Sequence, residues 1–192
     1  LDGTPVPVSS EVPVGMYLDP DLLARERSEL FDRTPIIVGH VSMLEKPGSH
    51  YTHDHLGKPL LIVKGKDGTV RAFLNVCRHR GMRLVVEEGI NKTPVFVCPY
   101  HHWTYGLDGT LKNAPLKDGF EGADLSCRNL KAVQCGVRHG FIWVQLDDSP
   151  AMDLDDFLGT MGDDLGAFSV ADQHTHKYET SLKKANWKLI VE

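Results

Sequence analysis

The sequence predicts a mainly β protein: a small antiparallel β-sandwich, flanked by an N-terminal helix and by a C-terminal segment that is partly helical and partly extended. Between residues 34 and 149, short runs of β-branched and aromatic residues are separated by turn residues. Asp67-Gly68 and Asp108-Gly109 are typical of tight hairpin turns. A chain of 192 residues, with 41% hydrophobic and 24% charged residues, has room for one compact core with extensions.

Residues 1–33 predict an arm followed by a helix. Residues 1–17 contain three prolines and little periodicity, which indicates an extended arm. Asp19 and Pro20 favour a helix start, because Asp caps free N–H groups and Pro suits the first helical turn. We expect this helix to span 19–32 and to dock through one apolar face. The residues of that face are Leu22, Leu23, Leu30 and Phe31.

The β domain is expected to occupy residues 34–149. Its clearest strands are runs of Val, Ile, Leu and aromatic residues, which favour strands when turn residues bound them. These runs are 36–38, 60–63, 70–74, 95–97 and 141–144.

Residues 150–192 predict a helix, an extended stretch and the start of another helix. Apolar residues recur at helical spacing from Leu154 to Leu165, whereas 174–183 show no such period. No Gly or Pro stop signal follows the segment 186–192, so we expect the chain to continue beyond Glu192.

The overall composition argues against several classes of protein. The net charge is -5, from 21 Lys+Arg against 26 Asp+Glu, which argues against a general nucleic-acid surface. No apolar run approaches the roughly 18–20 residues that span a bilayer, and no secretory signal pattern opens the chain. The four cysteines are too sparse for a disulfide scaffold. We therefore expect a cytoplasmic, metal-carrying protein.

Two short motifs carry the candidate chemistry. Cys77-Arg78-His79 and Cys98-Pro99-Tyr100-His101 each place one thiol and one imidazole on a loop that follows a predicted strand. Thiolate sulfur and imidazole nitrogen suit either zinc or an iron–sulfur cluster. Zinc needs one tetrahedral centre and tolerates many spacings. A [2Fe–2S] cluster with two Cys on one iron and two His on the other needs paired loops of this kind.

The residues around the ligands favour the iron–sulfur alternative. Residues 75–81 and 98–105 resemble the Rieske [2Fe–2S] domain of Rieske non-heme iron (aromatic ring-hydroxylating) oxygenase α subunits. Asn186-Trp187-Lys188 is similar to the opening of that family's catalytic domain. The resemblance implies a Rieske-type β-sandwich at 34–149, and a linker helix with the start of the catalytic domain at 150–192.

The resemblance also implies roles for six residues. Cys77 and Cys98 would bind one iron of the cluster, and His79 and His101 the other. Arg80 and Trp103 would complete the cluster-binding surroundings. His102 stands where the family usually has Gly, which puts the backbone of that turn in doubt. A cluster bound by His102 in place of His101 is the competing interpretation.

The function implied by the resemblance is electron transfer within a terminal oxygenase. A ferredoxin or reductase would reduce the cluster, which would feed a mononuclear Fe(II) in a neighbouring α subunit of a homotrimer or an α3β3 assembly. That iron would hydroxylate an aromatic substrate with O2, as in the dioxygenases of aromatic hydrocarbon catabolism. Its two-His, one-carboxylate site would lie beyond Glu192. We therefore expect no catalytic residue in this chain and no turnover by this chain alone.

Two other hypotheses remain open. A stand-alone Rieske ferredoxin needs little beyond the β domain, so the helix at 19–32 and the segment 150–192 argue against it. A structural zinc domain would be silent in visible absorption and in electron paramagnetic resonance, which a [2Fe–2S] cluster is not.

Other Cys and His residues have simpler interpretations. Cys127 and Cys135 favour reduced, partly buried thiols over a disulfide or a second metal. The clustered His50, His53 and His55 lack a third ligand of suitable geometry and predict a solvated strand. His174 and His176 have the same weakness.

Charged and aromatic residues surround the two motifs. Arg78, Arg80 and Arg83 are solvated loop charges or contacts for an acidic partner. Trp103 and Tyr105 are expected to pack beneath the second loop, and Trp143 in the core.

The loop residues also suggest a low cluster potential. High-potential Rieske proteins have a disulfide between the loops and a Ser hydroxyl. The matching positions here are Met82, Tyr100 and Trp103, which supply neither.

Overall fold

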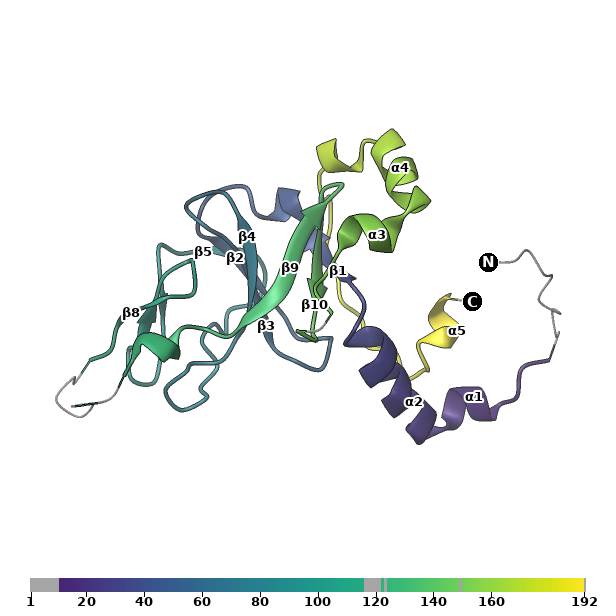
Figure 1. The fold of residues 1–192 in the computed structure, drawn as a ribbon, viewed down its shortest axis with the longest axis horizontal. Coiled ribbons are helices and arrows are strands. Elements are labelled where there is room, and N and C mark those ends of the chain that lie inside the picture. The colour runs from purple at the N-terminus through teal and green to yellow at the C-terminus, as the bar shows by residue number, and fades with distance from the viewer. Residues whose placement is uncertain (1–10, 116–121, 123, 149, 192) are drawn as a thin grey trace.

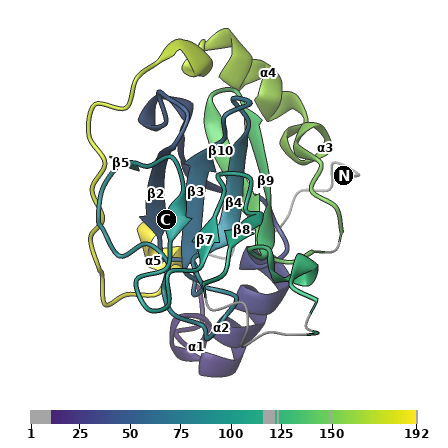
Figure 2. The same cartoon turned by 90° about the vertical axis from the view of Figure 1, so that its left-hand side faces the viewer.

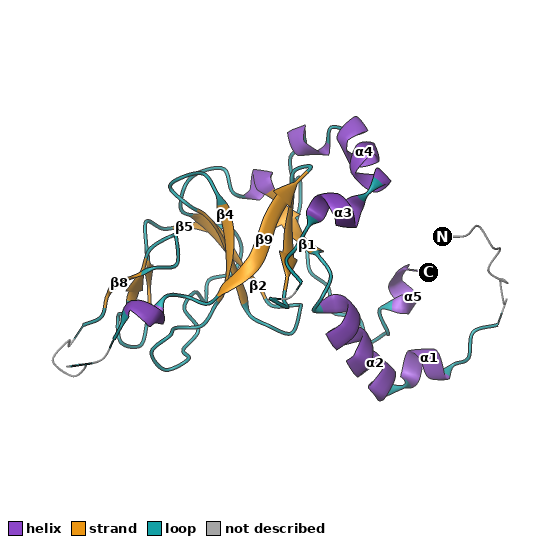
Figure 3. Ribbon diagram, viewed as in Figure 1, coloured by secondary structure: helices purple, strands orange, loops and turns teal. Residues whose placement is uncertain are grey.

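The computed structural model describes residues 11–115, 122, 124–148 and 150–191. The strands lie together at the centre of the fold, and short helices flank them (Figures 1 and 3). The strands are β1 (Ile36–His40), β2 (Ser49–His53), β3 (Leu60–Lys64), β4 (Val70–Leu74), β5 (Asn91–Lys92), β6 (Phe96–Val97), β7 (Thr104–Tyr105), β8 (Leu111–Asn113), β9 (Ala132–Arg138) and β10 (Phe141–Gln145).

The strands form two antiparallel sheets. Seven strands pair in the order β1-β10-β9-β4-β3-β2-β5, and three in the order β6-β7-β8. The smaller sheet lies in front of the larger one in Figure 2. The expected fold class, a small antiparallel β-sandwich with two loops and flanking helices, is confirmed. Asp67-Gly68 joins β3 to β4 and Asp108-Gly109 joins β7 to β8, as their turn chemistry predicts.

Each of the five predicted strand runs lies in or overlaps an observed strand, whereas β2, β5, β7, β8 and β9 were not singled out. The prediction of a solvated strand at 50–55 is wrong in part. His50 and His53 on β2 are buried, at 4% and 9% exposure. The His50 ring meets Phe96 edge-on at 5.1 Å and its Nδ1 lies 2.9 Å from the Gly48 carbonyl. The buried His50 imidazole, with these partners, belongs to the core.

The N-terminal helix begins as predicted. Helix α2 (Pro20–Glu26) follows Asp19, whose carboxylate accepts from the N–H groups of Asp21 and Leu22 at 2.8 and 3.2 Å. It continues as a π-helical turn, η1 (Arg27–Phe31). A further short helix, α1 (Gly15–Leu18), lies inside the segment predicted to be extended. Residues 1–10 of that segment lie outside the described residues.

The predicted docking face is confirmed in part, because Leu22 and Phe31 are half-buried whereas Leu23 and Leu30 are exposed. Phe31 meets the Trp187 indole edge-on at 5.1 Å. Glu26 accepts from Trp187 Nε1 at 2.9 Å and from Lys188 Nζ at 2.6 Å. The helical arm is therefore held by polar and aromatic contacts with residues about 160 positions away.

The C-terminal helical pattern is interrupted. Helix α3 (Leu154–Leu158) ends at Gly159, with φ +47°, and α4 (Thr160–Ala167) starts directly after it. Beyond α4 the chain runs along the edge of the large sheet to α5 (Lys188–Val191), which lies near α2 (Figures 1 and 2). The remaining short turns are the 3-10 helices η2 (Val41–Met43), η4 (Ser126–Arg128) and η5 (Val170–Asp172). No helix among the described residues has the length and apolarity to cross a bilayer.

Two apolar cores support the sheets. One contains Leu61, Val63 and Phe73 of the large sheet together with Tyr105 of the small sheet. The other lies around Leu60, Ile62, Ile142 and Val144. Trp143 is buried, as predicted. The first core lies between the two sheets and includes both predicted cysteine ligands, so it positions the candidate site.

Candidate metal centre

Two loops with the same backbone hydrogen bonds form the candidate centre. In the first, Cys77 N–H donates to the Met82 carbonyl at 2.7 Å and Gly81 N–H to the Cys77 carbonyl at 3.0 Å. The second loop repeats this pattern from Cys98 to the Trp103 carbonyl at 2.8 Å and from His102 to the Cys98 carbonyl at 3.0 Å. Each Cys therefore starts an equivalent turn.

The repeated turn explains the unusual residue at 102. The fourth residue after each Cys has a left-handed backbone, with φ +73° at Gly81 and +57° at His102. Left-handed backbone favours glycine, because a Cβ crowds the following carbonyl. His102 therefore occupies a glycine position, and its imidazole is exposed.

We expect His102→Gly to stabilise the protein by about 1 kcal/mol, since it relieves the left-handed strain, and to leave the cluster in place. Urea unfolding and the resonance of the reduced cluster measure the two effects. Gly81→His is the matched control and should destabilise by a similar amount. Loss of the cluster in His102→Gly would show that His102, not His101, is a ligand.

The structure brings the four predicted ligands together in two pairs. Cys77 and Cys98 are both 2% exposed and lie in the same apolar core, where Cys98 raises the pKa of Cys77. The rings of His79 and His101 meet edge to face with centroids 4.6 Å apart, and both are half-buried. Across the described residues, no three His, Cys, Asp or Glu side chains gather around one point as ligands of a single ion.

Trp103 packs against the histidine pair, whereas Arg80 lies exposed beside it. Trp103 is 2% exposed and stacks on the His79 ring at 4.9 Å with an interplanar angle of 5°. Trp103 thus comes from the second loop but supports the histidine of the first. Arg80 is exposed beside His79.

Tyr105 has a polar role that the sequence analysis missed. Its hydroxyl lies 3.4 Å from Cys77 Sγ and accepts from the Arg78 N–H at 3.0 Å. A metal-bound thiolate carries no proton, so the hydroxyl is the donor to sulfur in the loaded protein. No sequence signal separated this Tyr from an ordinary core aromatic.

Burial shifts the pKa of one residue in each pair, and the two shifts differ in their effect on metal binding: the raised pKa of Cys77 disfavours the ligating thiolate, whereas the lowered pKa of His79 favours the ligating neutral imidazole. Burial raises the pKa of the Cys77 thiol, and Cys98 adds to this rise. Burial also lowers the pKa of His79, with further lowering by His101 and Arg80. A neutral imidazole is the form that ligates iron. Two buried thiols and two imidazoles on paired loops match the donor set of a Rieske cluster.

Other candidates are placed elsewhere. Cys127 is exposed and Cys135 half-buried, and both are free thiols. Burial raises the pKa of Cys135 to about 12. Arg83 forms an ion pair with Asp54, and both side chains stay partly exposed to solvent, at 37% and 42%. His174 and His176 are exposed.

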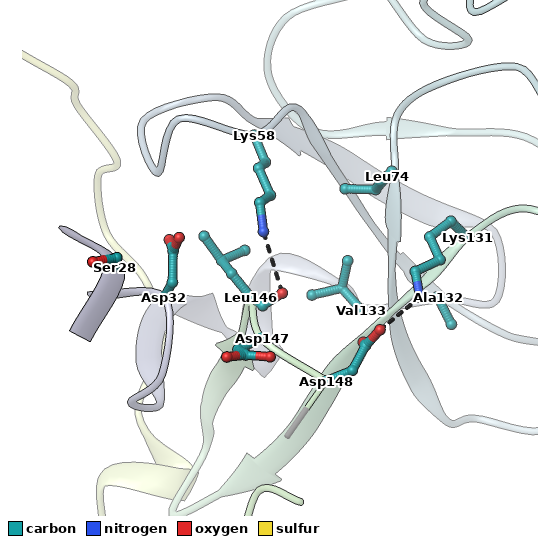
Figure 4. A pocket seen from close by; sticks show the side chains of 10 residues that line it. All are labelled: Ser28, Asp32, Lys58, Leu74, Lys131, Ala132, Val133, Leu146, Asp147 and Asp148. Carbon is teal, nitrogen blue, oxygen red and sulfur yellow. Dashed lines mark hydrogen bonds and ion pairs between the residues drawn. The ribbon is translucent and has the colours of Figure 1, made fainter. Parts of the chain in front are cut away.

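A cavity of about 480 Å³ lies where β4 ends and β9 begins, beside η1 (Figure 4). Its floor includes Leu74, Val133 and Leu146. Its polar groups bind to protein: Lys131 pairs with Asp148 at 2.7 Å, and Lys58 donates to the Leu146 carbonyl at 3.3 Å. None of the predicted cluster ligands lines this cavity.

Comparisons with known proteins place this arrangement in a family. Residues 34–136 match the Rieske [2Fe–2S] domain. The glycine betaine monooxygenase oxygenase subunit of Chromohalobacter salexigens is 38% identical over 181 residues, which cover 94% of this chain and 40% of that protein. The chlorobenzene dioxygenase α subunit of a Cupriavidus strain is 34% identical over 188 residues, covering 92% of this chain and 40% of that protein.

A solved structure extends the similarity to nearly the whole chain. The quaternary ammonium Rieske monooxygenase CntA, in complex with γ-butyrobetaine, superposes with a TM-score of 0.86 at 31% identity. The match covers 93% of this chain and 51% of CntA, so the chain spans about half the length of that protein. A Rieske domain carries a [2Fe–2S] cluster, and the domain match covers more than half of the chain. The chain therefore belongs to the Rieske [2Fe–2S] family, and its relatives are Rieske oxygenase subunits.

Proposed function

We propose that this chain is the electron-transferring Rieske portion of a terminal oxygenase. Cys77 and Cys98 hold one iron of the cluster, and His79 and His101 hold the other. The observation that carries this assignment is the pairing of thiol with thiol and imidazole with imidazole across two equivalent loops. When bound, the cluster takes up and releases one electron.

The residues of the chain keep the two ends of the cluster site in different environments. The thiols lie in the core between the sheets, where Tyr105 reaches Cys77. The imidazoles lie nearer to solvent, where Trp103 fixes the plane of His79. A reductase or ferredoxin therefore approaches the histidine side. The acceptor is a mononuclear iron outside this chain, in a neighbouring subunit of a trimeric or α3β3 enzyme.

The substrate class is a proposal that the relatives guide. The resemblance of the ligand motifs suggests hydroxylation of an aromatic compound, and similarity to the chlorobenzene enzyme supports it. Quaternary ammonium compounds are better supported, because the glycine betaine enzyme is 38% identical and the CntA superposition covers 93% of this chain. We therefore propose oxidation of a quaternary ammonium compound with O2 as the reaction of the whole enzyme.

Two measurements test this proposal. The reduced chain should give the paramagnetic resonance of a [2Fe–2S] cluster with nitrogen couplings from two histidines, one of which disappears in His79→Cys and in His101→Cys. The full-length enzyme, supplied with a reductase, should consume O2 with glycine betaine or carnitine and not with chlorobenzene. A colourless chain that binds zinc would contradict the iron–sulfur assignment. Turnover of chlorobenzene, without turnover of glycine betaine or carnitine, would favour an aromatic substrate.

The cluster should have a midpoint potential below about 0 mV, within the Rieske range of about −150 to +300 mV. Fewer hydrogen bonds to sulfur stabilise the reduced form less. This chain has Met82, Tyr100 and Trp103 where high-potential members have a disulfide and a Ser hydroxyl. The exposed Arg78 and Arg80 oppose this effect weakly, because water and salt screen them. A redox titration near neutral pH that gives a midpoint above about +150 mV would contradict the argument.

Tyr105→Phe should lower that midpoint by about 30–60 mV. The lost hydrogen bond to Cys77 Sγ is stronger in the reduced, more negative state, and about 1 kcal/mol corresponds to roughly 40 mV for one electron. Tyr51→Phe is the control, because the Tyr51 hydroxyl donates to the Val38 carbonyl at 3.1 Å and its ring lies in the other core. An unchanged midpoint in Tyr105→Phe would show that the hydroxyl does not reach sulfur in the loaded protein.

A further inference from the structure

Asn75 forms an amide clasp just before the first ligand loop. It follows β4, lies two residues before Cys77 and is fully buried, at 0% exposure. Its Nδ2 donates to the Val85 carbonyl at 2.7 Å, and its Oδ1 accepts from the Val85 N–H at 2.9 Å. One side chain therefore satisfies both backbone groups of a buried residue ten positions later.

The first loop needs this clasp because its ends are poorly paired. The second loop is flanked by β6 and β7, which pair Phe96 with Tyr105 and Val97 with Thr104. The first loop has only the isolated bridge between Val76 and Arg83. After it, the chain continues to β5, which pairs with β2 and not with β4.

The clasp is anchored to the rest of the fold on both sides. The Asn75 N–H donates to the Pro59 carbonyl at 2.8 Å, in the turn before β3. The Val85 carbonyl also accepts from Arg83 Nε at 3.1 Å, and Arg83 pairs with Asp54 beyond β2. Movement of Val85 relative to Asn75 would therefore shift the loop that carries both first-loop ligands.

We propose that Asn75 is a positioning residue for the cluster: it closes residues 75–85 into one unit and thereby sets the placement of Cys77 and His79. This inference rests on the proposed function. An amide is the side chain that both donates and accepts here, whereas an unsatisfied buried N–H or C=O is costly. The clasp keeps the loop in its binding geometry before the iron arrives, which reduces the ordering that the cluster must impose.

The test compares Asn75→Asp and Asn75→Leu with the control Asn91→Leu. Asp keeps the shape and the acceptor but loses the donor, and Leu loses both. Asn91 donates to the Glu88 and Gly89 carbonyls at 3.0 and 3.4 Å, farther along the same connection. Hydrogen exchange of the Val85 amide is measured in the cluster-free chain. The g-values of the reduced cluster and its rate of loss to an iron chelator are measured in the loaded chain.

We expect Val85 exchange to rise at least tenfold in Asn75→Leu and less in Asn75→Asp. Both variants should shift the g-values and lose iron at least tenfold faster, whereas Asn91→Leu stays within twofold of the wild type. If the Leu variant does not fold, the Asp variant decides. Wild-type g-values and release rates in Asn75→Asp, or equal effects in Asn91→Leu, would overturn the proposal. A wild-type chain that takes up no cluster would overturn the proposed function, and Val85 exchange would still test the clasp.

Discussion

Replacing Cys77 or Cys98 with Ser should abolish cluster assembly. Iron in such clusters is held by thiolates, and a hydroxyl is a much poorer ligand for it. Both sulfurs are buried in the core between the sheets, so no exposed side chain nearby can substitute for them. Because metal binding contributes directly to folding free energy, the loaded protein should also lose thermal stability. Visible absorption and the resonance of the reduced protein measure the loss.

Cys127→Ser is the matched control for this experiment. Cys127 is a free, exposed thiol in η4, outside both ligand loops. The Cys127→Ser variant should retain the full visible absorption and reduced-state resonance of the wild type. A complete reduced-state signal in either Cys77→Ser or Cys98→Ser would contradict the ligand assignment and require a different sulfur.

The ligand loops could be predicted from the sequence because their chemistry is local. Each motif spans three or four residues, and the residue types restrict the metal more than the fold does. The hairpins at Asp67-Gly68 and Asp108-Gly109 were predictable for the same reason, since two residues determine the turn. Pairing of the two loops is not local, and it followed from the resemblance and not from the spacing.

Elements whose buried side is polar could not be predicted in this way. Strand β2 buries Ser49, His50 and His53, so its burial does not follow an alternation of apolar residues. The helical period from Leu154 to Leu165 gave no sign of the break at Gly159, where a positive φ separates α3 from α4. Glycine adopts a positive φ readily and can therefore end a helix inside such a period.

Side-chain contacts between distant segments were equally hidden. The segments at 19–32 and 186–188 were each singled out, but nothing in either indicates that Glu26 binds Trp187 and Lys188. Tyr105 and Asn75 likewise act through partners 28 and 10 residues away. Their roles depend on which loops the fold brings together.

The small sheet approaches the large one closely at Gly109. This residue lies in the β7–β8 turn, where φ is +80° and the carbonyl accepts from the Leu130 N–H at 2.8 Å. A Cβ at Gly109 would lie 2.7 Å from Cζ of Phe73 on β4, and even nearer to Cε1. Phe73 belongs to the core that contains both cysteines. Any side chain at 109 must therefore move the ring or the turn.

We expect Gly109→Ala to destabilise the protein by about 2–4 kcal/mol, as the sum of left-handed strain and overpacking against Phe73. Gly68→Ala is the control for strain alone, because Gly68 has φ +81° and no neighbouring atom within 4 Å of a Cβ. It should cost about 1–2 kcal/mol. Urea unfolding of both variants measures the difference between their free energies of unfolding. Adding Phe73→Leu to Gly109→Ala should restore part of the lost stability, since the smaller side chain leaves room for the new Cβ. Equal losses in the two glycine variants would show that the sheets do not depend on this contact. If the two sheets do depend on this contact, Gly109→Ala should also weaken retention of the cluster. The second loop leads directly into β7, and β7 belongs to the small sheet that contains the Gly109 turn.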